Sequence, residues 1–441
     1  MIIGIKTYPI FIVLIPTGII FLWFLTNHVG FTLILLSFLT VVKGVIIEFL
    51  PVFATIDITI LLTIIIWFGL IKLLLAGEWN YIEERKQSLV LFILFTSIVA
   101  FSFFFTPSPE YGANKILRFS LIGMTMFITP LIVIQSRNDV KQLLQLFIYS
   151  VFLLLFAVLA QFVYFLFLGK FALLLGYFNR FSLPGANPIQ VGRFLAIGAT
   201  FMLVNLIRKS NINSITIIIS LITLLLGMIA TGSRGPLVSI ILGLLIYVYL
   251  FEKEKRQQIF IYGIFFVFIS VGILLLFPED LTRRFFDMTQ GAVLMTSEGV
   301  KKISTIATRF NYWQMSLESW VSSLWNNIFG LGAGGFSSLF IWRDWRWYPH
   351  NVFFEIMVEF GLVGITIFTC FLLAALNDIR KGLIKGSLSD HSALWIAATL
   401  VMFIAAQFSG DINDNRLLWM LIGISVASTH IDQLKNVKST A

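Results

Sequence analysis

The sequence predicts an all-α protein, a polytopic transmembrane bundle of about 12 to 13 helical spans with one large loop. Hydrophobic residues make up 58% of the 441 residues and charged residues only 12%, and the mean hydropathy is +0.94. Soluble chains have roughly 45 to 50% apolar residues. Stretches such as 52–75 and 142–168 are long enough to cross a bilayer as helices. Lipid offers backbone polar groups no partner, so every span must be helical.

Apolar stretches alternate with short polar connections along nearly the whole chain. The expected spans are 9–26, 29–47, 52–75, 88–105, 115–135, 142–168, 190–207, 214–231, 235–251, 259–277, 351–378, 392–409 and 416–430. We therefore divide the chain into an N-terminal transmembrane bundle (1–277), an extracytoplasmic loop with short helices (278–350), and C-terminal spans with a short cytoplasmic tail (351–441). These three parts form a single integrated domain, because no loop is long enough to fold alone.

Basic residues predict the orientation, since they concentrate in short cytoplasmic connections. They occupy every second connection from the third onward, at Arg85 and Lys86, Arg137 and Lys141, Arg208 and Lys209, Lys253, Lys255 and Arg256, and Arg380, Lys381 and Lys385. The loop 278–350 is then outside. Ten spans before this loop also put the N-terminus outside, whereas a cytoplasmic N-terminus requires one span fewer, and both remain open.

Net charge and cysteine content narrow the function classes. The net charge of +9 would suggest a nucleic-acid partner in a soluble domain, but here it reflects membrane topology, and we expect no nucleic acid to bind. Cys370 is the only cysteine, which excludes an intrachain disulfide and a cysteine-based metal site.

Arg234 is the first candidate site residue. It lies in the segment 231–236 between two apolar runs, with almost no loop around it. An arginine so close to hydrocarbon is costly unless it faces a cavity or a partner. Flanking glycines let a bulky ligand approach the backbone, and a guanidinium binds phosphate in a bidentate way. The alternative is an anchor at the membrane interface.

Three further arginines are expected near the same outer face. Arg309 begins a helical pattern that continues through Trp313, Leu317, Trp320 and Leu324 and would lie along the membrane surface. Its alternative role is a lid whose arginine reaches lipid headgroups.

Arg180 and Arg193 flank a turn-rich segment, 179–188, in another outer loop. Arg193 lies close to the start of the following helix, so its side chain can point towards the same outer face as Arg234. For Arg180, a structural role in the turn is an equal alternative.

A histidine at the mouth of a membrane span is the candidate base. His350 follows Pro349 and precedes a long apolar run. A histidine has a usual pKa near 6.5 and is suited to deprotonating a hydroxyl. Asn351, Glu355 and Glu359 follow and share one helix face, from which Glu355 would orient the imidazole or contact substrate. The alternative is an interfacial hydrogen-bonding histidine.

Glycines precede this histidine by about twenty residues. Gly332 and Gly334 belong to a run, 330–335, whose free N–H groups are suited to an anion, although many turns have the same composition.

Together these motifs resemble the O-antigen ligase and Wzy-type polymerase superfamily. The motifs are Ser233-Arg234-Gly235, Arg309 with Trp313, Gly330-Leu331-Gly332-Ala333-Gly334, Pro349-His350-Asn351 and Glu359-Phe360-Gly361-Leu362-Val363-Gly364. The resemblance covers residues 175–370, and the earlier spans match only in hydropathy.

The resemblance implies an inverting glycosyltransferase of the bacterial cytoplasmic (inner) membrane, with its site facing the periplasm or cell exterior. Its donor would be a glycan on undecaprenyl pyrophosphate, and its acceptor a hydroxyl of a glycan or lipid-linked glycan. His350, Arg234 and Arg309 would be catalytic. The residues that would bind substrate are Arg193, Arg180, Asn351, Glu355, Gly332 and Gly334. No cofactor and no metal are expected, and a chain-length regulator and a flippase are candidate partners.

Two alternatives remain from the sequence. An O-antigen, capsule or exopolysaccharide polymerase is favoured, and a ligase that attaches polymer to lipid A core or another acceptor is the alternative within the same class. A lipid-linked sugar transporter or flippase is the alternative of another class. Transporters often have internal repeats and ionisable groups at midplane. This sequence has no convincing repeat, and its charged candidates gather at one face.

Overall fold

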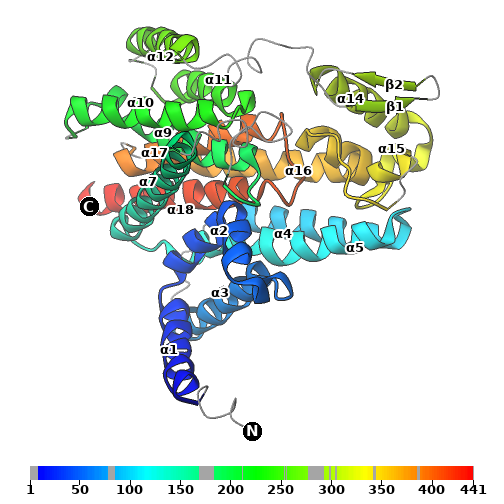
Figure 1. Ribbon diagram of the computed structural model, residues 1–441, viewed down its shortest axis with the longest axis horizontal. Coiled ribbons are helices and arrows are strands. Elements are labelled where there is room, and N and C mark those ends of the chain that lie inside the picture. Colours follow the sequence, from blue (N-terminus) through cyan, green and yellow to red (C-terminus); the bar gives the residue numbers. More distant parts are fainter. Residues whose placement is uncertain are drawn as a thin grey trace.

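The structure is a computed structural model that describes residues 8–77, 85–167, 183–210, 212–252, 254, 256–276, 293–296, 299–302, 305–340, 344–384 and 388–440. It is a helical membrane bundle, as predicted (Figure 1). The long helices are α1 Tyr8–Asn27, α2 Val29–Phe49, α3 Ile58–Leu75, α4 Lys86–Phe101, α5 Pro109–Arg118, α6 Met124–Val133, α7 Arg137–Phe167, α9 Pro188–Arg208, α10 Ser214–Ala230, α11 Arg234–Phe251, α12 Arg256–Leu276, α16 Val352–Ile384, α17 Asp390–Ala405 and α18 Arg416–Thr440. A π-helical turn, Phe119–Gly123, joins α5 to α6 into one continuous span.

Each expected span coincides with a helix, and nine helices of the described part are long and apolar enough to cross a membrane. Some boundaries differ: α18 continues to Thr440 instead of ending at residue 430, and α3 begins at Ile58 instead of residue 52. The side chain of Asp57 caps this helix by accepting a hydrogen bond from Thr59 N at 3.0 Å. Asn187 and Asn213 cap α9 and α10 in the same way. Polar caps therefore set boundaries that hydropathy alone leaves undefined.

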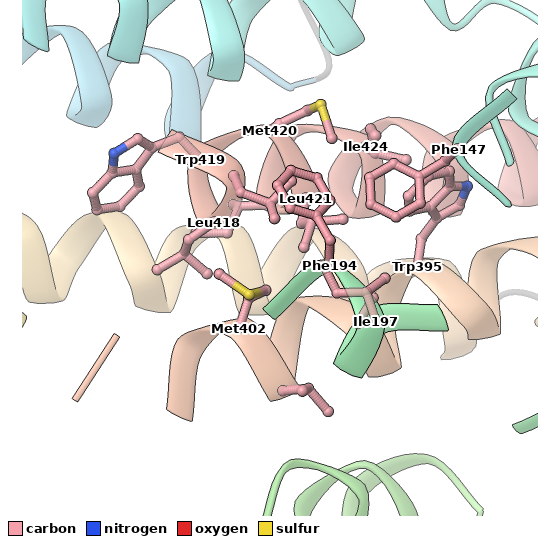
Figure 2. Close-up of a cluster of buried hydrophobic side chains, with 14 of the residues drawn as sticks. Phe147, Phe194, Ile197, Trp395, Met402, Leu418, Trp419, Met420, Leu421 and Ile424 are labelled. Atoms are coloured by element: carbon pink, nitrogen blue, oxygen red, sulfur yellow. The ribbon is translucent and has the colours of Figure 1, made fainter. Parts of the chain in front are cut away.

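The centre of the bundle is formed by α9, α17 and α18. In the most apolar stretch of α9, and likewise in that of α18, 89% of the residues are buried inside the protein. Figure 2 shows their contact with α7, where Phe147 and Phe194 lie beside Trp395 and the buried face of α18. The Phe147 and Trp395 rings are 5.6 Å apart in an edge-to-face arrangement. Their packing fixes the positions of the helix ends that carry the candidate site.

α16 is broken at Gly361, where the backbone leaves the helical region (φ 59°, ψ −157°). The break frees two carbonyls, and Val358 O and Glu359 O accept hydrogen bonds from Leu331 N at 2.9 Å and Gly332 N at 2.8 Å. Gly330 also has a positive φ. The glycine loop is therefore docked onto the broken helix, an arrangement that needs close backbone approach on both sides.

Short elements cover one end of the bundle, which we call the loop end (Figure 1). They are α14 Thr305–Val321, α15 Leu324–Phe329, a 3₁₀ helix Gly335–Leu339, and a hairpin of β1 Val293–Thr296 and β2 Gly299–Lys302. The hairpin was not predicted; its strands pair antiparallel with Val293 opposite Lys302. The expected single helix from Arg309 to Leu324 is two, because Ser323 ends the run and caps α15 through Asn326 N.

Candidate active site

The turn before α11 holds Arg234 at the loop end of the bundle. Gly232 has a φ of +60°, which suits glycine, and Ser233 is the extended N-cap residue that precedes Arg234. Gly192 of α9 faces this turn so closely that an added methyl group would lie 3.0 Å from Pro236 Cγ. The small residues thus bring α9 against the turn, and with it Arg193 towards Arg234.

Three of the predicted arginines line one cavity of about 60 Å³. The cavity lies between the start of α9, the turn before α11, α14 and the end of α17. Its lining residues are Ile189, Arg193, Gly232, Ser233, Arg234, Gly235, Pro236, Ile306, Arg309, Ala405, Phe408 and Ser409. We call it the arginine cavity. Three guanidinium groups around so small a space repel one another and attract an anion, and their planar donors match a phosphate.

Arg193 both supports the cavity and faces it. Its Nη2 donates to Ala405 O at 2.9 Å and to Ser409 O at 2.6 Å, which anchors the turn after α17. Its Nη1 is buried and has no hydrogen-bond partner among the described residues. A buried donor without a partner costs about 1 to 3 kcal/mol, so an incoming anion would recover that energy.

Arg309 is positioned by the aromatic face of α14. Trp313, one turn later, donates from Nε1 to Pro349 O at 3.1 Å and stacks on Phe354 of α16 with ring centroids 5.3 Å apart. These contacts tie α14 to the segment that carries His350. The helical pattern predicted from the sequence is therefore the face that joins Arg309 to His350.

His350 is held in an uncommon backbone conformation with a φ of +61°, which a non-glycine residue adopts only when its surroundings impose it. Its ring lies 4.5 Å from that of Tyr348 and 6.2 Å from that of Tyr312. His350 Nδ1 is buried and has no hydrogen-bond partner in the described part of the chain.

Electrostatics keep this imidazole neutral. Burial of the ring and, after it, the positive charge of Arg309 lower the pKa of His350 to about 4. Asp411 opposes the shift and Arg346 adds to it. A neutral imidazole at physiological pH has the protonation state that a general base needs.

Asn351 and Glu355 have well-defined structural contacts. Asn351 Oδ1 caps α16 by accepting from Phe353 N at 2.9 Å and Phe354 N at 3.2 Å. Glu355 is fully buried and pairs with Lys115 of α5 at 2.5 Å, as does Glu359. The expected shared face of Glu355 and Glu359 is confirmed, and it points into the protein towards this lysine.

The glycine run also has its N–H groups engaged within the protein. Gly332 N donates to Glu359 O at 2.8 Å, and Ala333 N donates to Ser102 Oγ at 3.0 Å. Gly332 and Gly334 have φ of +85° and +73° and are buried against the 102–112 segment. Close packing accounts for both glycines. Arg180 lies outside the described residues.

The sequence reasoning missed a charged network beside His350. Arg346 Nη2 contacts Asp411 at 3.2 Å and Asp414 at 2.6 Å, which joins the segment before His350 to the turn after α17. Burial opposes ionisation of Asp411, but the charges of Arg346 and Lys115 hold its pKa below the usual value. Burial and the neighbouring Asp411 raise the pKa of Asp414.

A signal for this network was present in the sequence. Four polar or charged side chains stand at Asp411, Asn413, Asp414 and Arg416, between two apolar runs, and ionisable groups at such a place favour a functional role. Within the described ranges, no three His, Cys, Asp or Glu side chains form a group suited to a metal ion.

Comparison with known families gives a match in this part of the chain. Residues 219–369 match the family Wzy_C, described as O-Antigen ligase. The match begins in α10 and ends in α16, so it includes Arg234, Arg309 and His350 and covers about a third of the chain. No curated protein matches the sequence. Residues 219–369 are therefore similar to the O-antigen ligase family, and this similarity supports a membrane enzyme of the O-antigen ligase and Wzy type.

Proposed function

We propose that the protein transfers a glycan from undecaprenyl pyrophosphate to an acceptor hydroxyl at the outer face of the bacterial cytoplasmic membrane. The observation that carries this proposal is the meeting of Arg193, Arg234 and Arg309 around one cavity, with the charge of Arg309 acting on His350. A volume of about 60 Å³ exceeds the roughly 10 to 15 Å³ that one water molecule requires. The space can therefore hold a phosphate group.

The reaction is a single inverting displacement. The acceptor oxygen bonds to the anomeric carbon of the donor sugar while the bond from that carbon to the phosphate oxygen breaks. The electron pair leaves with the pyrophosphate, whose growing charge Arg234 and Arg309 stabilise. The acceptor proton passes to a ring nitrogen of His350 and then to solvent. Pyrophosphate needs no general acid to leave, and the broken bond supplies the energy, so the proposal requires neither nucleotide nor metal.

We propose a polymerase, in which the acceptor is a second lipid-linked glycan. A ligase is the second candidate, because the matching family is described as O-Antigen ligase. The lipid on the product distinguishes them: a polymerase leaves the extended glycan on undecaprenyl pyrophosphate, whereas a ligase moves it to another carrier.

The direct test is turnover by purified protein supplied with a lipid-pyrophosphate donor. We expect product to form in excess EDTA and without nucleotide, at a rate within about twofold of the untreated sample, because arginines carry the phosphate charge. Mass spectrometry of the product lipid then identifies polymerase or ligase. Activity that disappears on chelation and returns with a divalent ion would contradict the mechanism.

A further inference from the structure

A second, larger cavity opens beside the arginine cavity. Its volume is about 460 Å³, within the roughly 300 to 1,000 Å³ of small-molecule sites. Its walls come from α5, the segment before His350 and the turn between α17 and α18. The lining residues are Thr40, Glu110, Tyr111, Asn114, Lys115, Arg118, Ile122, Gly123, Asp344, Arg346, Asp411, Asn413, Asp414 and Arg416. We call it the polar cavity.

One chain segment separates the two cavities. Residues 405–409 face the arginine cavity, whereas residues 411–416 face the polar cavity. His350 is influenced from both sides, by Arg309 of one wall and by Asp411 and Arg346 of the other. The candidate base therefore lies close to both cavities, although it lines neither.

Arg416 differs from the other basic residues of the polar cavity. Its buried Nε has no hydrogen-bond partner among the described residues, although the charges of Asp414 and Asp57 act on the guanidinium. The neighbouring cations differ, because Arg346 pairs with Asp411 and Asp414, and Arg118 pairs with Asp57 at 2.7 Å. A guanidinium carries five N–H donors, so Arg416, as a lining residue, can offer donors to oxygen atoms of a ligand.

The chemistry of the walls favours a sugar over a second polyanion. Four acidic residues, Glu110, Asp344, Asp411 and Asp414, balance the four basic residues Lys115, Arg118, Arg346 and Arg416. A space without net charge has no general preference for anions. Carboxylates that accept from hydroxyls, together with donors such as Arg416, suit the dense hydroxyl groups of a carbohydrate.

We propose that the polar cavity binds a sugar of the acceptor glycan. This inference rests on the proposed function, in which the donor pyrophosphate occupies the arginine cavity. The two substrates would then be held on opposite sides of the 405–416 segment. Charged residues of both cavities act on His350, the candidate base.

The test measures glycan binding without donor. The probe is the repeat-unit oligosaccharide released by mild acid from the cell's own lipid-linked intermediates, titrated onto full-length protein in nanodiscs and followed by saturation-transfer NMR. Two variants alter opposite walls: Arg416→Gln removes the unpaired donor, and Asn114→Trp fills the cavity from an exposed position of α5. We expect each to weaken glycan binding at least tenfold and to raise the acceptor KM similarly, with the donor KM unchanged.

Two controls separate this proposal from the proposed function. Arg234→Lys, in the other cavity, should bind the oligosaccharide as the wild type does while losing transfer. Arg380→Gln removes an exposed arginine of α16 away from both cavities and should change neither measurement. Glycan binding that both wall variants weaken supports the site even if no transfer is detected. A folded Asn114→Trp protein that binds glycan as tightly as the wild type would overturn it.

Discussion

The chemistry proposed for His350 depends on a ring that stays neutral. Its pKa of about 4 means that protonation, and with it loss of the base, begins well below the usual value near 6.5. We expect kcat/KM for the donor, which reports the free enzyme, to fall only as the pH drops towards 4. Bound pyrophosphate brings negative charge near Arg309, which favours the imidazolium. The acidic limb of the pH profile of kcat should therefore lie at a higher pH than the acidic limb of kcat/KM. An acidic limb of kcat/KM at pH 6.5 would contradict the buried environment of His350.

Removal of the same ring distinguishes a catalytic from a structural role. His350→Ala should reduce kcat by on the order of a hundredfold or more, the usual contribution of a general base, with donor binding largely retained. Both are measured on one detergent-purified sample with its thermal unfolding checked. A well-folded His350→Ala protein with wild-type kcat would exclude His350 as the base.

Arg234 should require a guanidinium and not merely a positive charge. Arg234→Lys keeps the charge but loses the bidentate fork, so we expect most activity to disappear while yield and thermal stability stay normal. Polymer length and amount in cells, with membrane levels measured in parallel, check this expectation. Lys86→Arg, at an exposed position at the start of α4, is the matched control and should behave as the wild type.

Local sequence context singled out residues that the structure brings together, but it did not show which residues far apart in the chain are in contact. Arg193, Arg234 and Arg309 each lie in an unusual context, beside a span or on an aromatic helix face, and the structure brings them to one cavity. Lys115 lies within a predicted span, and nothing local shows that it meets Glu355 and Glu359, some 240 residues away. Hydropathy places a residue along the membrane normal but does not say which helices are neighbours.

At the scale of elements, the broken helix α16 and the glycine loop act as one unit. A methyl group added at Gly361 would lie 2.5 Å from Ile328 O and 2.6 Å from Gly330 N, at a φ of +59° that side chains rarely adopt. Gly361→Ala should therefore detach the loop from α16, lower the unfolding temperature and reduce transfer, because in a chain of 441 residues each kcal/mol lost lowers that temperature by roughly 1 °C.

Gly18→Ala is the matched control for this substitution. Gly18 lies in α1, where an added methyl group meets nothing within 4 Å. This variant should unfold at the wild-type temperature or slightly above it, because alanine favours a helix. Equal behaviour of the two variants would show that the close approach of Gly330 and Gly361 is not needed for stability.

At the scale of the whole molecule, the open question is which face of the membrane holds the site. Basic residues predict that the loop end is outside. α1 lies across the direction of α16 and α18 in Figure 1, and whether it crosses the bilayer decides the side of the N-terminus. Nine spans before the loop would put it in the cytoplasm, and ten would put it outside. Both counts predict the loop end outside, because the basic connections before and after the loop, at 253–256 and 380–385, are predicted to be cytoplasmic.

The orientation follows from accessibility of single cysteines in intact cells. Cys370 is the only native cysteine and is exposed on α16, so a Cys370→Ala protein serves as the background. Ser322→Cys lies between α14 and α15 at the loop end, and Lys86→Cys begins α4 at the opposite end. A membrane-impermeant maleimide should label the first before lysis and the second only after it. Both residues are exposed, so labelling reports the side and not burial. The reverse pattern would place the arginine cavity in the cytoplasm and remove the proposed donor, whose glycan is presented outside.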